Sequence, residues 1–135
     1  MDYSTLKNKI MQDKLSIIIN KNDVFFAFSQ DQLDEGLKKI KNKKENLTSI
    51  GAGGFMPKKN VKTYIKDTAS LYKWFEAEVK KLNPNKVIRY ELNNYECYYS
   101  GDITRAYEVL KDYDFTREDV NHVFHNRNYK LNKTI

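Results

Sequence analysis

The stretch SIGAGGFMPKKN, residues 49–60, holds three of the five glycines of the chain, followed by a proline and two lysines. A phosphate-binding loop needs glycines that run directly into a helix, so that backbone N–H groups converge on the anion. Here three residues separate the last glycine from Lys58, which fits neither a P-loop nor a dinucleotide-binding fingerprint. We therefore interpret Gly51–Gly54 as a bulge or a close-approach site in a strand. Lys58, Lys59 and the amides after Asn60 remain candidates for holding a phosphate or sulfate.

Outward from this stretch, helical periodicities alternate with short apolar runs. Ser29 with Gln32, and Thr116 with Asp119, have the spacing of a helix N-terminal capping box. The patterns predict helices over 3–19, 30–44, 60–82, 103–113 and 117–127, strands over 24–29 and 47–56, and a hairpin over 86–100. This order predicts an α+β fold with a small, mostly antiparallel sheet and helices packed on one face. The 135 residues suit a single domain over 1–135, with the helix 3–19 and the tail 128–135 at its periphery.

The expected hairpin, KVIRYELNNYECYYS (residues 86–100), would turn at Asn93-Asn94. Its core face would carry Cys97, and its open face would carry Arg89, Glu91, Glu96 and Tyr98. Opposed carboxylates of Glu91 and Glu96 could act as general acid and base or bind a metal. The alternative is a solvated sheet face with an ion pair to Arg89.

The net charge of +6 is concentrated in one segment. Residues 38–66 contain nine lysines and a single acid, Glu45, so this segment carries +8 and the rest of the chain −2. Such a local excess can steer an anionic partner, although lysine lacks the fork with which arginine recognises a base edge. The alternative is a solvated helix end. The candidate anion- or partner-binding residues are Lys38, Lys39, Lys41, Lys43, Lys44, Lys58, Lys59, Lys62 and Lys66.

Several other kinds of site find little support. The lone Cys97 excludes an internal disulfide and favours a reducing, cytoplasmic setting, and no signal peptide or membrane-spanning segment is expected. His122 and His125 are one helical turn apart but lack the further ligands of a zinc site, so we interpret them as surface residues. No catalytic triad or metalloprotease motif is present. We expect neither a cofactor nor a metal.

Three segments together carry a resemblance: FFAFSQDQLDEG (25–36), SIGAGGFMPKKNV (49–61) and YELNNYECYYSGD (90–102). They resemble shared blocks of a family of small uncharacterised proteins carried by phages and mobile elements of Gram-positive bacteria. The resemblance covers about residues 24–110. It implies a genomic setting and the cytoplasm of a bacterial host cell, and it brings no catalytic residue.

These observations favour a non-catalytic accessory protein that acts by binding, such as an anti-defence (anti-CRISPR-like) or host-takeover factor. Its partner would be nucleic acid or a host nucleoprotein or defence protein, engaged through the lysines, with Arg89 and Tyr98 as further interface contacts. The alternative is a small enzyme acting on a nucleotide or phosphate ester, with Glu91 and Glu96 as acid and base and Lys58 and Lys59 on the phosphate. A third is a virion or replication subunit with only a protein partner.

Overall fold

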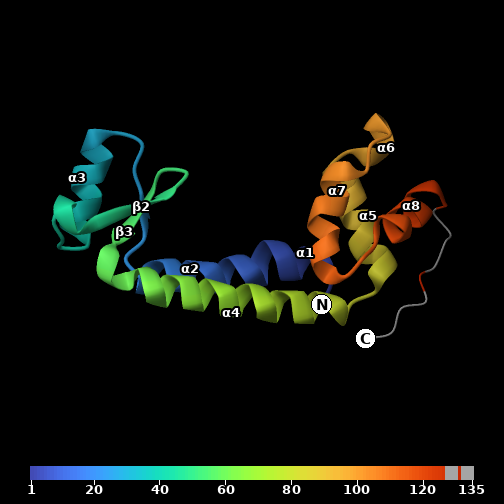
Figure 1. Cartoon of the computed structure of the whole chain (residues 1–135), viewed down its shortest axis with the longest axis horizontal. Helices are drawn as coiled ribbons and strands as arrows, with labels where there is room; N and C mark the ends of the chain where they lie inside the picture. The colour runs from blue at the N-terminus through green and yellow to red at the C-terminus, as the bar shows by residue number, and fades with distance from the viewer. Residues whose placement is uncertain (127–130, 132–135) are drawn as a thin grey trace. The chain divides into compact units, whose positions relative to one another are not determined.

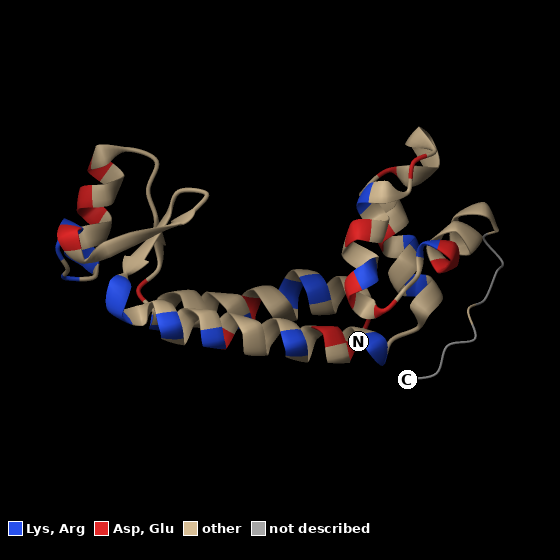
Figure 2. Ribbon diagram, in the orientation of Figure 1, with Lys and Arg blue, Asp and Glu red and all other residues tan. Residues whose placement is uncertain are grey.

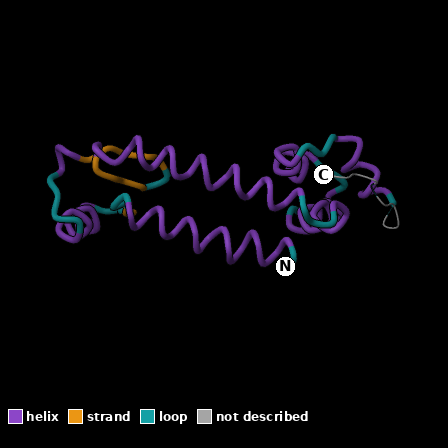
Figure 3. Tube along the Cα trace, turned by 90° about the horizontal axis from the view of Figure 1, so that it is seen from below, coloured by secondary structure: helices purple, strands orange, loops and turns teal. Residues whose placement is uncertain are grey.

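The computed structural model describes residues 1–126 and 131, and the chain forms two compact units (Figure 1). Unit 1 comprises Met1–Ile10 and Lys73–Ile135, and unit 2 comprises Met11–Tyr72. Helices dominate the described residues, and three short strands form one antiparallel sheet (Figure 3). The predicted α+β class is confirmed.

The sheet lies in unit 2 and is built around the glycine stretch. Its strands are β1 (Phe25–Phe26), β2 (Leu47–Gly51) and β3 (Gly54–Pro57), in the order β1-β3-β2. The predicted single strand over 47–56 is wrong, because Gly51, Ala52 and Gly53 all have positive φ and reverse the chain between β2 and β3. The register of the β2–β3 pair shifts between Ser49 and Gly51, so the bulge expected over Gly51–Gly54 is wrong in its position. The glycine stretch is therefore a tight hairpin turn.

Helix α3 (Gln30–Lys39) packs on one face of this sheet. The Ser29 hydroxyl accepts a hydrogen bond from the Gln32 backbone N–H at 3.2 Å, as its spacing predicts. The helix ends five residues before the predicted residue 44, because Lys41 takes a left-handed conformation. The Asn42 N–H then bonds to the Leu37 carbonyl and the Lys41 N–H to the Lys38 carbonyl, which completes a Schellman motif.

Gly36 gives this packing a sharp test, because a Cβ there would lie 2.3 Å from the Phe25 ring. Gly36→Ala is expected to destabilise unit 2 by about 1–3 kcal/mol through overpacking, even though alanine is the better helix former by about 1 kcal/mol. Thermal unfolding measures the effect. Glu35→Ala, at the exposed neighbouring position, is the control and should change stability by less than about 0.5 kcal/mol. An unchanged or higher melting temperature for Gly36→Ala would contradict the packing.

The remaining helices of unit 2 are α2 (Met11–Lys21) and the first part of α4 (Val61–Lys80). A 3₁₀ turn, η3 (Lys58–Asn60), leads into α4. Asn60 lies in η3, and its side-chain amide donates to the Asn22 carbonyl at 3.0 Å. The Lys21 ammonium and Asp67 carboxylate, 3.1 Å apart, join α2 to α4.

Unit 1 is helical, and the predicted hairpin over 86–100 is wrong. Its residues form α5 (Pro84–Asn94) and α6 (Cys97–Ser100). Asn83 caps α5 and Pro84 occupies its first position, a pairing typical of helix starts. The fully buried side chains then recur at helical spacing, at Val87, Ile88, Glu91 and Leu92.

Two further helices complete this unit, α7 (Thr104–Leu110) with a 3₁₀ turn η4 (Lys111–Tyr113), and α8 (Arg117–His125). The predicted capping box of α8 is confirmed, since Thr116 and Asp119 bond reciprocally to each other's backbone N–H groups.

The beginning of the chain belongs to the core of unit 1. It forms α1 (Tyr3–Thr5) and a π-helical turn, η1 (Leu6–Ile10), which continues into α2. Tyr3 and Leu6, in this part of the predicted helix 3–19, are buried. Apart from residue 131, the predicted tail 128–135 lies outside the described residues.

Candidate functional site

The nine lysines of residues 38–66, named here the lysine set, all belong to unit 2 and all have exposed side chains. Figure 2 shows lysines at the C-terminal end of α3 and again at the start of α4. They come from the last turn of α3 (Lys38, Lys39), the segment that follows it (Lys41, Lys43, Lys44), the turn η3 (Lys58, Lys59) and the first turns of α4 (Lys62, Lys66).

The sheet brings two parts of the lysine set to one end of a hairpin. Strands β2 and β3 are antiparallel, and Leu47 at the start of β2 pairs with Pro57 at the end of β3. The 3₁₀ turn η2 (Lys44–Asn46) directly precedes Leu47, and η3 directly follows Pro57. Lysines that are 14 positions or more apart in the sequence are therefore adjacent in the fold.

These charges are not compensated by acids in contact with them. In the described part of the chain, no member of the lysine set forms a salt bridge, whereas Lys21 in the same unit pairs with Asp67. The one acid of the segment, Glu45, is exposed. Uncompensated like charges on one surface produce a positive potential that attracts polyanions.

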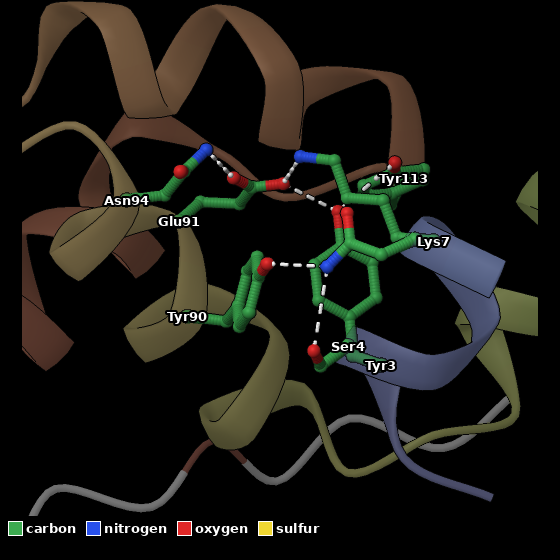
Figure 4. A network of polar contacts seen from close by, with 8 residues as sticks. Tyr3, Ser4, Lys7, Tyr90, Glu91, Asn94 and Tyr113 are labelled. Carbon is green, nitrogen blue, oxygen red and sulfur yellow. Dashed lines mark hydrogen bonds and ion pairs between the residues drawn. The ribbon is translucent and has the colours of Figure 1, made fainter.

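A second polar cluster lies inside unit 1, centred on Glu91 of α5 (Figure 4). This carboxyl group is fully buried. One of its oxygens, Oε2, accepts from the Tyr3 hydroxyl at 2.5 Å and from the Lys7 ammonium at 2.6 Å, and Oε1 accepts from the Asn94 amide at 3.1 Å. The hydroxyl oxygen of Tyr113, in η4, lies 3.3 Å from that of Tyr3. The cluster thereby ties the first turns of the chain to α5 and η4.

Both tyrosines of this cluster hold their protons more tightly than usual. Burial, followed by the hydrogen bond to Glu91, raises the pKa of Tyr3 far above its ordinary value. Burial is also the main cause that raises the pKa of Tyr113, to about 12.

We therefore expect stability to fall in alkali. A phenol whose pKa is higher in the folded than in the unfolded protein stabilises the fold below the unfolded pKa of 10, and this contribution is lost as the pH rises through the folded value. The free energy of unfolding in urea should be lower at about pH 11 than at about pH 9. Tyr3→Phe removes one of the two groups, so its stability should fall less over the same interval. An equal fall in the variant would show that Tyr3 does not contribute.

The buried cluster is suited to positioning rather than to acid–base chemistry. Both oxygens of Glu91 are engaged in hydrogen bonds. Glu96, by contrast, is exposed and precedes α6 in a left-handed conformation. The strand pairing that would have set Glu91 opposite Glu96 does not exist, so the expected carboxylate pair is wrong.

The other predicted open-face residues also lie on helices. Arg89 is half-buried on α5. The Tyr98 ring of α6 stacks on the Phe124 ring of α8, with 5.1 Å between the ring centroids. Cys97 is buried, as predicted. Tyr3, Lys7 and Tyr113 escaped the sequence analysis, because their contacts with Glu91 or with one another cross 84 to 110 positions of the sequence. Asn94, only three positions from Glu91, was instead placed in the turn of the expected hairpin.

No group of three or more His, Cys, Asp and Glu residues is arranged to hold a metal ion in the described ranges. His122 and His125 are exposed on α8, and His122 lies 3.7 Å from Glu118. Within residues 1–126 and 131, none of the helices has both the length and the apolar character needed to cross a membrane.

Residues 7–129 match the model of a family of unknown function, DUF7659. The chain belongs to this family. The DUF7659 match begins in η1 and extends past α8, so it is wider than the resemblance over residues 24–110. It spans both compact units of the DUF7659 fold. No curated protein and no solved structure matches the chain.

Proposed function

We propose that this DUF7659 protein is a non-catalytic binding protein whose lysine set engages nucleic acid, either free or within a nucleoprotein complex. The observation that carries the proposal is the concentration of nine exposed lysines, none in a salt bridge among the described residues, within a segment that holds a single acid.

Lysine side chains favour contacts with the phosphates of a nucleic acid over sequence-specific contacts with its bases. An ammonium group attracts a phosphate as a point charge, whereas recognition of a guanine edge uses the bidentate fork of arginine. Unit 2 contains no arginine. Binding through the lysine set is therefore expected to be largely independent of sequence and strongly dependent on salt.

We further propose that the protein acts in the cytoplasm of a bacterial host, as an accessory protein of a phage or mobile element. A surface that attracts phosphates would suit an anti-defence or host-takeover factor directed at a nucleoprotein complex. The resemblance of three sequence blocks to phage- and element-borne proteins supports this setting.

The enzyme hypothesis receives no comparable support. It required Glu91 and Glu96 as an acid–base pair beside a phosphate held by Lys58 and Lys59. Glu91 is buried with both oxygens engaged, and the two lysines belong to the other compact unit.

Binding of the purified protein to single-stranded DNA, duplex DNA and RNA across a salt series tests the proposal. If the lysine set neutralises about 4–8 phosphates, the logarithm of the affinity for duplex DNA should fall with the logarithm of salt at about −0.9 per phosphate. Absence of binding to all three at low salt would overturn the proposal of direct contact.

A further inference from the structure

A pocket of about 390 Å³ opens within the lysine set. Its lining residues are Asn42, Asn46, Pro57, Lys58 and Lys59. Two lysines and two asparagines thus line a cavity near the lower end of the roughly 300–1,000 Å³ found for small-ligand sites. That size suits one small molecule better than an extended ligand.

Local structure fixes the walls of this pocket. The pairing of Leu47 with Pro57 sets η2 beside η3, and Pro57 is almost completely buried. The Schellman motif after α3 directs the chain through Lys41 to Asn42, which also lines the pocket. The strand register and the helix end therefore bring the lining residues of the pocket together.

The two asparagines are held by each other and by the backbone. Oδ1 of Asn42 accepts from the Lys43 N–H at 2.8 Å and from Nδ2 of Asn46 at 3.2 Å. In the described part of the chain, no bond is formed by Nδ2 of Asn42 or by Oδ1 of Asn46. These two lining residues therefore keep one donor and one acceptor for a ligand.

We infer that this pocket holds one nucleotide unit of a bound single strand, an inference that rests on the proposed function. The phosphate lies against Lys58 and Lys59, and the polar edge of the sugar or base meets the amides of Asn42 and Asn46. A single strand can turn one nucleotide into a pocket, whereas a duplex offers the protein mainly its outer phosphates. The pocket therefore predicts a preference for single strands that the lysines alone would not give.

Two paired substitutions separate the pocket from general charge. Lys58→Ala/Lys59→Ala and Lys62→Ala/Lys66→Ala each remove two charges from the lysine set, but only the first pair lines the pocket. The probe is a short labelled oligothymidylate at fixed salt, with duplex DNA of the same length for comparison. The pocket pair should lose about 10-fold more single-strand affinity than the control pair, since charge-assisted hydrogen bonds in a defined site exceed surface attraction. On duplex DNA the two pairs should behave alike.

A neutral substitution completes the test. Asn46→Ala changes no charge at an exposed position, and it should weaken single-strand binding while leaving the salt slope unchanged. Thymidine monophosphate should compete with the oligonucleotide better than inorganic phosphate does. Equal losses for both lysine pairs on the single strand, with no effect of Asn46→Ala, would overturn the inference but leave the proposed function intact. Absence of binding by the unaltered protein would overturn both.

Discussion

Replacing Glu91 by alanine is expected to destabilise the protein by about 3–5 kcal/mol, the cost typical of breaking a buried ion pair by removing one partner. The Lys7 ammonium would lose its carboxylate 2.6 Å away, and the Tyr3 hydroxyl and the Asn94 amide would lose their acceptor. The side chain is fully buried, so its truncation also leaves a cavity. Urea unfolding followed by circular dichroism measures the loss.

Glu96 provides the matched control for this experiment. It is the same residue type five positions further on, but it is exposed. Glu96→Ala should change the free energy of unfolding by less than about 0.5 kcal/mol. Equal effects of the two substitutions would contradict the buried cluster and would instead fit the solvated pair that the sequence suggested.

A milder substitution tests the geometry of the same cluster if Glu91→Ala fails to fold. Tyr3→Phe removes only the hydroxyl that donates to Glu91. It keeps the aromatic ring, which packs edge-on against the Tyr90 ring with 5.1 Å between the ring centroids. A loss of about 1–3 kcal/mol is expected for an unmade buried hydrogen bond. Stability unchanged from the unaltered protein would show that the hydroxyl is not a partner of Glu91.

Short sequence motifs predicted the structure correctly where it depends only on residues close together in the sequence. Ser29 and Thr116 cap helices as their spacing predicts, because a cap is decided within four residues. The glycine stretch was assigned correctly to a sheet rather than to a phosphate loop. Its division into two strands was missed, because the sequence does not reveal that Ala52 joins its neighbouring glycines at positive φ.

The segment 86–100 shows where such signals conflict. Its valine, isoleucine and tyrosines favour strands, and this propensity outweighed a helical pattern of buried positions at 87, 88, 91 and 92. The decisive local signal was Asn83-Pro84, which starts α5. Glu91 at a buried position was the hint of a distant partner, since a buried carboxylate needs one.

Exposure of the lysines was predictable from composition, whereas their freedom from salt bridges and their arrangement depend on tertiary structure. The sequence separates Asn46 from Lys58 by a whole hairpin, and only the pairing of β2 with β3 brings both to one pocket. Sequence analysis could therefore propose an anion-binding segment, but it could not propose a pocket.

The largest effect on binding is expected from changing three lysines of the segment after α3 to glutamine. Lys41→Gln, Lys43→Gln and Lys44→Gln together remove three exposed charges that form no salt bridge with any described residue. Each lost phosphate contact should reduce the magnitude of the salt slope by about 1. Each phosphate contact raises the affinity for duplex DNA roughly eightfold when the salt concentration falls from about 1 M to about 0.1 M. Loss of three contacts should therefore lower the affinity at about 0.1 M salt by as much as a few hundred-fold.

The control variant also removes three lysine charges, but from lysines that already form salt bridges. Lys80, Lys81 and Lys111 form salt bridges with Asp114, Glu78 and Glu108, respectively, at 2.7, 2.9 and 2.6 Å. Their triple change to glutamine lowers the net charge equally, so any effect of the overall field is the same in both variants. If binding depends on local contacts with the lysine set, the control keeps the original salt slope. Equal slopes and affinities in the two variants would mean that net charge alone attracts the nucleic acid, and the lysine set would then not be its binding surface.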